Sequence, residues 1–183
     1  MNEFVEKLKE IYKGITMSEE MSHNYLGMIM THNREKQTVD IDMKKYIAPC
    51  VEEFQKDEPD EEIRLVNTPA TNFPFRTRDA KILSKKRAGI FHSLVAKLLF
   101  VAKHALLAIT FLASRVKNPD IGDWVKMLRV IGYLMNTEGI HLTLCCKEIK
   151  DLVWYIDGSY ATHDDMRGQS GAVLGLCSAF QIE

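Results

Sequence analysis

The stretch "IFHSLVAKLLFVAKHALLAITFLASRVK", residues 90–117, carries the strongest helical pattern in the chain. Its apolar residues recur every three or four positions and therefore share one helical face. They are Leu94, Leu98, Val101, Ala105, Ala108 and Leu112. Neither proline nor glycine interrupts the stretch. We therefore predict a single helix of about 25 residues, ~38 Å long at ~1.5 Å per residue.

Residues 93–113 of this stretch have the length of a membrane span. Lys97, Lys103 and His104 interrupt it, and each charge would cost a few kcal/mol inside a bilayer. We therefore expect a buried helix of a soluble protein, with no membrane partner.

The segments on either side supply further helices and strands. Helical spacing predicts helices over residues 2–13 and 44–55, and period-two alternation around residues 32–36 predicts a β-hairpin. Beyond the central stretch, a proline at position 119 favours a new helix over residues 120–135. Further strands are predicted over residues 140–145, 151–157 and 171–177. The predicted class is α+β, with an N-terminal helix and hairpin, a central helical layer and C-terminal strands.

The charges are balanced overall but locally uneven. The 183 residues include 24 Lys and Arg against 25 Asp and Glu. Residues 51–62 hold seven acids and one base, whereas residues 76–87 hold six bases and one acid. The basic run could lead into a helix that faces a polyanion. The alternative is that both runs are solvated loops.

The four cysteines are Cys50, Cys145, Cys146 and Cys177. With an N-terminus that lacks a signal-peptide pattern, they indicate free thiols in a reducing compartment. The expected location is intracellular, in the cytoplasm or nucleus, and the chain is not expected to be secreted. Adjacent cysteines on a strand point to opposite faces, so His141, Cys145 and Cys146 are not expected to bind zinc.

Six blocks of the sequence, in this order, resemble the Pol polyprotein of copia-type LTR retrotransposons. The blocks are SHNYLGMIM, VDIDMKKYI, VNTPATN, FHSLVAKLLFVAK, FLASRVKNPDIGDWVKMLRVIGYLMNTEGIHLTL and VWYIDGSYATHDDMRGQSGAV. The resemblance implies the end of a reverse transcriptase (RNA-directed DNA polymerase) palm with a primer-grip-like hairpin over residues 1–75. It implies thumb and connection helices over 76–136 and the start of an incomplete ribonuclease H β-meander over 137–183.

Two sets of contacts with nucleic acid follow from the resemblance. Tyr25, Leu26 and Gly27 are similar to the primer grip, which holds the 3′ end of the growing strand. His92, Ala96 and Phe100 match the thumb-helix positions that face the minor groove of the template-primer, an RNA:DNA or DNA duplex. The alternatives are a plain hairpin with Tyr25 in the core, and a helix with Phe100 in the core and His92 on the surface.

Asp157 matches the first metal-binding carboxylate of ribonuclease H. That family holds two magnesium ions with several acids, so Asp157 alone is not expected to bind magnesium stably. His163, Asp164 and Asp165 follow in a polar turn and are expected to be solvated turn residues.

The sequence departs from the family in three respects. It has no Tyr-x-Asp-Asp pair of polymerase aspartates and no counterpart of the later nuclease carboxylates. It also lacks the family's Arg-Pro-Asp-Ile turn between the two thumb helices, because Ala105 continues directly into Leu106. A catalytically inactive fragment that keeps template-primer contact surfaces is therefore expected.

Two alternatives remain open. One is a helical protein-interaction module, with self-association through an exposed helix face or strand edge. The other is a ribonuclease H completed by a partner chain or by Asp151, Asp164 or Asp165.

Overall fold

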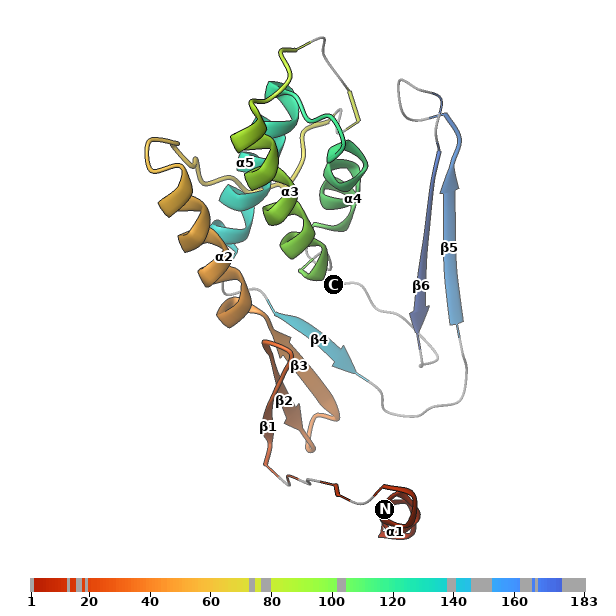
Figure 1. Cartoon of the computed structure of the whole chain (residues 1–183). Helices are drawn as coiled ribbons and strands as arrows, with labels where there is room; N and C mark the ends of the chain where they lie inside the picture. The colour runs from red at the N-terminus through yellow and green to blue at the C-terminus, as the bar shows by residue number, and fades with distance from the viewer. Residues whose placement is uncertain are drawn as a thin grey trace.

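The computed structural model describes residues 2–12, 14, 15, 18, 20–72, 75, 76, 80–101, 105–137, 141–145, 153–161, 166 and 168–175. Within these residues the chain is α+β, with five helices and two antiparallel sheets, which confirms the predicted class (Figure 1). The helices are α1 (Asn2–Ile11), α2 (Lys44–Asp57), α3 (Lys85–Phe100), α4 (Leu106–Arg115) and α5 (Ile121–Asn136). The strands are β1 (Ser22–Tyr25), β2 (Met28–Asn33), β3 (Thr38–Asp42), β4 (Leu142–Cys145), β5 (Val153–Ser159) and β6 (Gln169–Gly175).

The core lies among α2, α3, α4 and α5, which pack on one another (Figure 1). Its fully buried side chains include Phe91, Leu98, Ile109, Met127 and Ile131. Burying these apolar surfaces is the main term that stabilises the helical layer. None of the helices in the described part of the chain is both long enough and apolar enough to cross a membrane.

The prediction of one long helix over residues 90–117 is wrong. Helix α3 ends at Phe100, and Ala105, with φ −146° and ψ 34°, lies outside helical geometry before α4 begins. The break lets α3 and α4 pack against each other and buries both Val101 and Ile109. In one continuous helix the two halves would lie in line, so they could not pack against each other. Tertiary packing therefore decides the break where no proline or glycine marks it.

The four-stranded sheet has the order β1-β2-β3-β4. The predicted hairpin is confirmed as β2 and β3, with Ile29 opposite Asp42, and a second hairpin, β1 with β2, precedes it. Strand β4 pairs with β3, with Thr38 opposite Cys145. It therefore joins the N-terminal sheet and does not form the expected meander with β5 and β6.

Strands β5 and β6 form a separate two-stranded ladder in which Asp157 lies opposite Gly171. On the strand that carries Asp157, Trp154, Tyr155 and Ile156 are all exposed. A two-stranded hairpin has no second layer of its own to bury either face, and α2 to α5 pack elsewhere. The environment of Asp157 is consequently open to solvent.

Candidate nucleic-acid contact surface

The turn between β1 and β2 carries the first three predicted contact residues. Tyr25 pairs with Met28, so Leu26 and Gly27 form a two-residue turn with φ values of 51° and 80°. Positive φ at both positions is typical of the type I′ turn that matches strand twist. Tyr25 and Leu26 are 56% and 66% exposed, which excludes the alternative of a core tyrosine.

Leu26 and Gly27 differ in how well they suit this turn. A branched side chain at positive φ is strained, and such strain is concentrated at functional sites. A Cβ on Gly27 would lie 3.1 Å from Cδ2 of Tyr46, so a larger residue there would be strained at positive φ and would crowd the Tyr46 ring. The turn therefore holds an exposed leucine at a geometrically constrained position.

Helix α3 presents the second set of predicted contact residues on its solvent side. Ser84 caps the helix, because its side chain accepts a hydrogen bond from the Arg87 backbone N–H at 3.3 Å. His92 and Ala96 are exposed, and Phe100 is 39% exposed. Phe100 is therefore not a core residue, and His92 lies at the surface as the alternative assumed. The spacing of four places all three residues on one stripe.

Tyr46, on α2, connects the two sets. Its ring centroid lies 4.8 Å from that of Phe100, and its hydroxyl donates a hydrogen bond to the Lys97 carbonyl at 3.3 Å. Burial raises the pKa of Tyr46, and the nearby Cys50 adds to the increase, so the hydroxyl stays protonated and can donate. Because Tyr46 also packs under Gly27, the turn and the helix stripe share one support.

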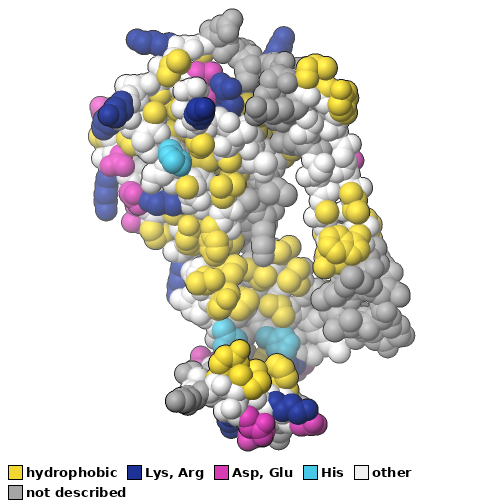
Figure 2. Space-filling view, turned by 45° about the vertical axis from the view of Figure 1, so that its right-hand side comes forward, with side chains coloured by type: hydrophobic (Ala, Val, Ile, Leu, Met, Phe, Trp, Pro, Cys, Tyr) yellow, Lys and Arg dark blue, Asp and Glu magenta, His cyan; other side chains and the backbone are white. Residues whose placement is uncertain are grey.

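We use the name turn–helix surface for the six predicted residues and Tyr46. It consists of Tyr25, Leu26, Gly27, Tyr46, His92, Ala96 and Phe100. Figure 2 shows hydrophobic side chains gathering where the helical layer meets the sheet. Through Tyr46 the structure places Gly27 close to Phe100, although the two residues are far apart in the sequence. Ala96 and His92 lie one and two turns of α3 away from Phe100 on the same helix.

The acidic and basic runs pair with each other. Arg87 donates to Glu58 at 2.7 Å and lies 2.6 Å from Glu61, and Lys86 lies 3.3 Å from Glu58. Burial raises the pKa of Glu58, but the hydrogen bonds from Arg87 and Lys86 outweigh it and leave that pKa lowered. Similarly, a hydrogen bond to Glu53 at 2.6 Å raises the pKa of Lys97. The alternative that the acidic and basic runs are only solvated loops is therefore incomplete, because several of their side chains form ion pairs with one another.

The pairing reduces the positive charge available to a polyanion along α3. Lys81 and Lys85 are exposed and form no ion pair with another residue of the described part of the chain. They stand near the N-terminal end of the helix that carries His92. Among the described residues at this end of α3, the electrostatic contribution to binding a polyanion would thus come mainly from Lys81 and Lys85.

Among the residues that the structure describes, no other metal ligands gather around Asp157. No group of three or more His, Cys, Asp or Glu in the described part of the chain could hold a metal ion. Asp151, His163, Asp164 and Asp165 lie outside the described residues. His141 lies 3.8 Å from Asp40, in the four-stranded sheet and not beside Asp157.

The sequence did not identify Tyr46 as part of the site. Its helical spacing predicted only that it lies on the apolar face of residues 44–55. Its contact with Phe100 spans 54 positions and depends on how α2 and α3 pack. A tyrosine at the edge of an apolar stripe was the only available signal, since such residues often bury the ring and leave the hydroxyl to a partner.

The fold and this surface define a small α+β chain with an exposed surface of mixed apolar and polar side chains. Comparison with protein-family models, with curated proteins and with solved structures found no match.

Proposed function

We propose that this chain contacts a template-primer duplex, RNA:DNA or DNA, through the turn–helix surface. The observation that supports this most directly is the joint support of the turn and the α3 stripe by Tyr46. Both elements remain exposed, so a rod-shaped ligand could touch them together. The resemblance to the copia-type Pol polyprotein supports the same assignment, and descent from a reverse transcriptase and ribonuclease H region is part of the proposal.

The α3 stripe has side chains that suit contact with the edge of a duplex groove better than binding of phosphates by charge. Ala96 allows the helix backbone to approach a sugar-phosphate chain closely, and Phe100 offers an apolar edge to the sugars. His92 can donate a hydrogen bond to a phosphate or sugar oxygen. Contacts of this kind position a duplex without reading its sequence.

The ion pairs along α3 set the expected salt dependence. If Lys81 and Lys85 provide about two phosphate contacts, raising salt from about 50 to 200 mM should weaken binding only ~10-fold. Shape complementarity and apolar contacts would supply the rest of the binding free energy. The proposal assigns no catalytic step to the chain, because two-metal nuclease chemistry needs several acids around one point.

The test uses Ala96→Glu, which places a carboxylate at the centre of the stripe. Affinity for a fluorescent RNA:DNA duplex, measured by anisotropy at low salt, should fall by about 10-fold or more because the new charge meets the phosphates. Val125→Glu is the matched control. It adds the same charge to an exposed helical position, 58% exposed on α5, and should bind like the original chain.

Two results would remove the proposal. One is the absence of saturable duplex binding by the folded original chain at low salt. The other is an equal loss of affinity in Ala96→Glu and Val125→Glu, which would indicate non-specific electrostatic attraction.

The β5–β6 ladder favours a second candidate function, self-association with another copy of this chain. Strand β5, VWYIDGS, has no Lys, Arg or Pro to protect its edge, and Ile156 is 76% exposed. Its single charge, Asp157, would face an uncharged residue if two copies of β5 paired antiparallel about Tyr155. A second copy therefore meets no charge repulsion at this edge.

Sedimentation velocity tests this candidate. The original chain should sediment as a dimer at tens of micromolar, and Ile156→Lys should be monomeric because it places a charge on the edge strand. Val125→Lys is the control and should remain dimeric. A monomeric original chain at these concentrations would exclude the candidate.

A further inference from the structure

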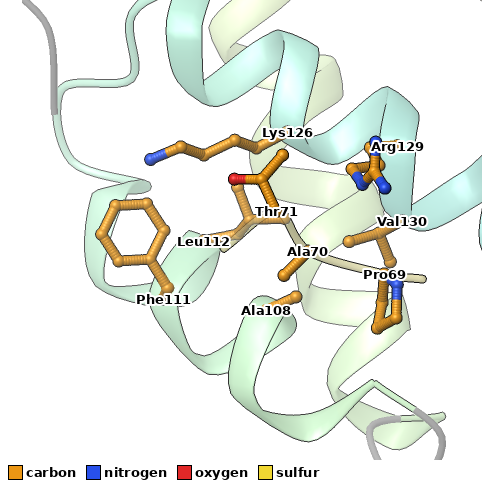
Figure 3. A pocket seen from close by; sticks show the side chains of 9 residues that line it. All are labelled: Pro69, Ala70, Thr71, Ala108, Phe111, Leu112, Lys126, Arg129 and Val130. Carbon is orange, nitrogen blue, oxygen red and sulfur yellow. The ribbon is translucent and has the colours of Figure 1, made fainter. Parts of the chain in front are cut away.

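The helical layer is closely filled where α4, α5 and the loop at residues 69–71 meet. The hollow that Figure 3 shows there leaves about 30 Å³, which is room for roughly one water molecule. The β5–β6 hairpin is different, because none of the described helices and no strand of the four-stranded sheet packs on it (Figure 1). Its side chains are therefore accessible to a second molecule.

The register of the hairpin sorts its side chains onto two sides, because successive residues of a strand point in opposite directions. Three cross-strand pairs share one side, which we call the hairpin face: Trp154 with Leu174, Ile156 with Ala172, and Gly158 with Ser170. A Cβ placed on Gly158 would lie 3.9 Å from the Ser170 Oγ, which agrees with this assignment.

The hairpin face is largely apolar, uncharged and open to solvent. Trp154, Ile156 and Leu174 are 55%, 76% and 45% exposed. Asp157 is the only charged residue of the two strands, and it lies on the opposite side of the ladder. Exposing such a face to water is unfavourable, and a two-stranded hairpin has no second layer of its own to cover it.

The side chains of the hairpin face become smaller from one end to the other. Trp154 and Leu174 form the tall end, whereas Gly158 and Ser170 form the low end. If two copies of the face stack with their strands running in opposite directions, the tall end of one copy lies over the low end of the other. The large side chains then fill the space above the small ones, as dense packing requires. The face is therefore complementary in shape to itself.

We propose that the hairpin face packs on the same face of a second copy of this chain, related to the first by a two-fold axis. Each hairpin supplies the layer that the other lacks, with the two layers about 10 Å apart. Neither copy brings a charge into the contact. The contact uses the face of the hairpin and not the edge of β5, so it does not depend on the edge pairing proposed above.

The contact is small, and its size sets the expected strength. The seven residue pairs span roughly 23 Å and the two strands roughly 10 Å, so two copies bury roughly 450 Å² in total. Stable interfaces bury at least about 1,200 Å². A dissociation constant on the order of 1 mM is therefore expected. Stacking should appear only at concentrations well above those at which the edge pairing is tested.

Sedimentation equilibrium of the full chain, from tens of micromolar to about 1 mM, measures the stacking. The average mass should rise towards twice the value found at the lowest concentration, whether or not β5 pairs at its edge. Leu174→Lys should weaken this step at least about 10-fold, because a lysine on the hairpin face would lose its water on stacking. Val173→Lys is the matched control. It adds the same charge to the neighbouring residue, 51% exposed on the opposite side, and should behave like the original chain.

Nuclear Overhauser contacts between copies test the arrangement itself, and they need no variant. In a sample that mixes isotope-labelled and unlabelled chains at the upper end of this concentration range, the Trp154 ring should show contacts with Gly158 or Ser170 of the second copy. This measurement decides the matter if Leu174→Lys fails to fold.

The proposal is overturned by any of four results. The first two are an average mass that does not rise with concentration, and equal weakening by Leu174→Lys and Val173→Lys. The third is the absence of contacts between copies from Trp154 to the low end of the face once the mass has risen. The fourth is a set of contacts from Trp154 to α1 or to the four-stranded sheet of its own chain, which would show that another segment covers the face.

Discussion

Replacing Asp123 with alanine is expected to lower the free energy of unfolding by about 3 kcal/mol, because it removes the acceptor of one buried and one half-buried donor. Asp123 is only 2% exposed and forms a capping box with Asp120 at the start of α5. Its carboxylate accepts from the Asp120 N–H at 3.1 Å and from Arg115 Nε at 3.0 Å. Without it, the buried Asp120 N–H and the half-buried Arg115 Nε–H lose this acceptor.

Asp123→Asn should cost less than Asp123→Ala, by about 1 to 2 kcal/mol, because an amide oxygen can still accept from the Asp120 N–H. Equilibrium unfolding in urea measures both variants. Equal destabilisation by Asn and Ala would mean that the charge, and not the hydrogen bond, carries the interaction.

The same carboxyl makes a prediction about pH. Burial raises the pKa of Asp123 and outweighs the lowering by the Asp120 N–H and Arg115. An acid whose folded pKa is raised adds stability that is complete below its unfolded pKa, about 4, and is lost as the pH rises through its folded pKa. The original chain should therefore lose stability relative to Asp123→Asn from about pH 4 upwards. If the difference in unfolding free energy between the two proteins does not change with pH across this range, the prediction is wrong.

Replacing Gly132 with alanine should lower the free energy of unfolding by about 2 kcal/mol, although alanine is the better helix former. Gly132 is buried in α5, and a Cβ there would lie 2.1 Å from the carbonyl oxygen of Arg64. No atom pair tolerates that separation, so the loop backbone at Arg64 must move. The movement would disturb the contact between the loop and α5.

Gly89→Ala is the matched control for this variant. Gly89 lies within α3, and nothing lies within 4 Å of the position its Cβ would take. The same substitution should there raise the stability by about 0.5 to 1 kcal/mol through helix propensity alone. Thermal unfolding of the two variants should therefore shift in opposite directions. A stabilised Gly132→Ala would show that the loop is not held against α5.

A helix or strand was predictable where its local sequence pattern agrees with the burial it has in the folded chain. The helix over residues 120–135 is confirmed as Ile121–Asn136, since the Asp120 cap and the apolar spacing act within one segment. The alternation of VDIDM likewise identified β3, in which Ile41 is buried. Period and capping are local properties, and they can be read without knowing the partner elements.

Features that depend on distant segments were not predictable. Residues 90–117 show unbroken helical spacing, yet the chain turns between Phe100 and Leu106. Strand β4 has the pattern of any short strand and could have paired with β5 as readily as with β3. In both cases the outcome depends on which apolar faces become buried together. The periodicity of the sequence carries no information about such distant partners.

The candidate site likewise has features that the sequence predicted and features that only the structure shows. The sequence, through its resemblance to a known family, identified Gly27 and the spacing of His92, Ala96 and Phe100 as a possible contact face. It did not reveal that Tyr46 joins them, or that Glu58 and Glu61 neutralise Arg87. The paired charges lower the salt dependence that is expected of the proposed duplex binding.

By itself, the sequence determined the α+β class, the positions of most helices and strands, and the residue types available on each face. These follow from hydrophobic period, caps and turn chemistry, which act over a few residues. Only the tertiary structure decided where the central helix breaks, which strands pair, and which exposed side chains form one surface. Those outcomes depend on which apolar faces are buried against one another, and that is defined only when all the elements are in place.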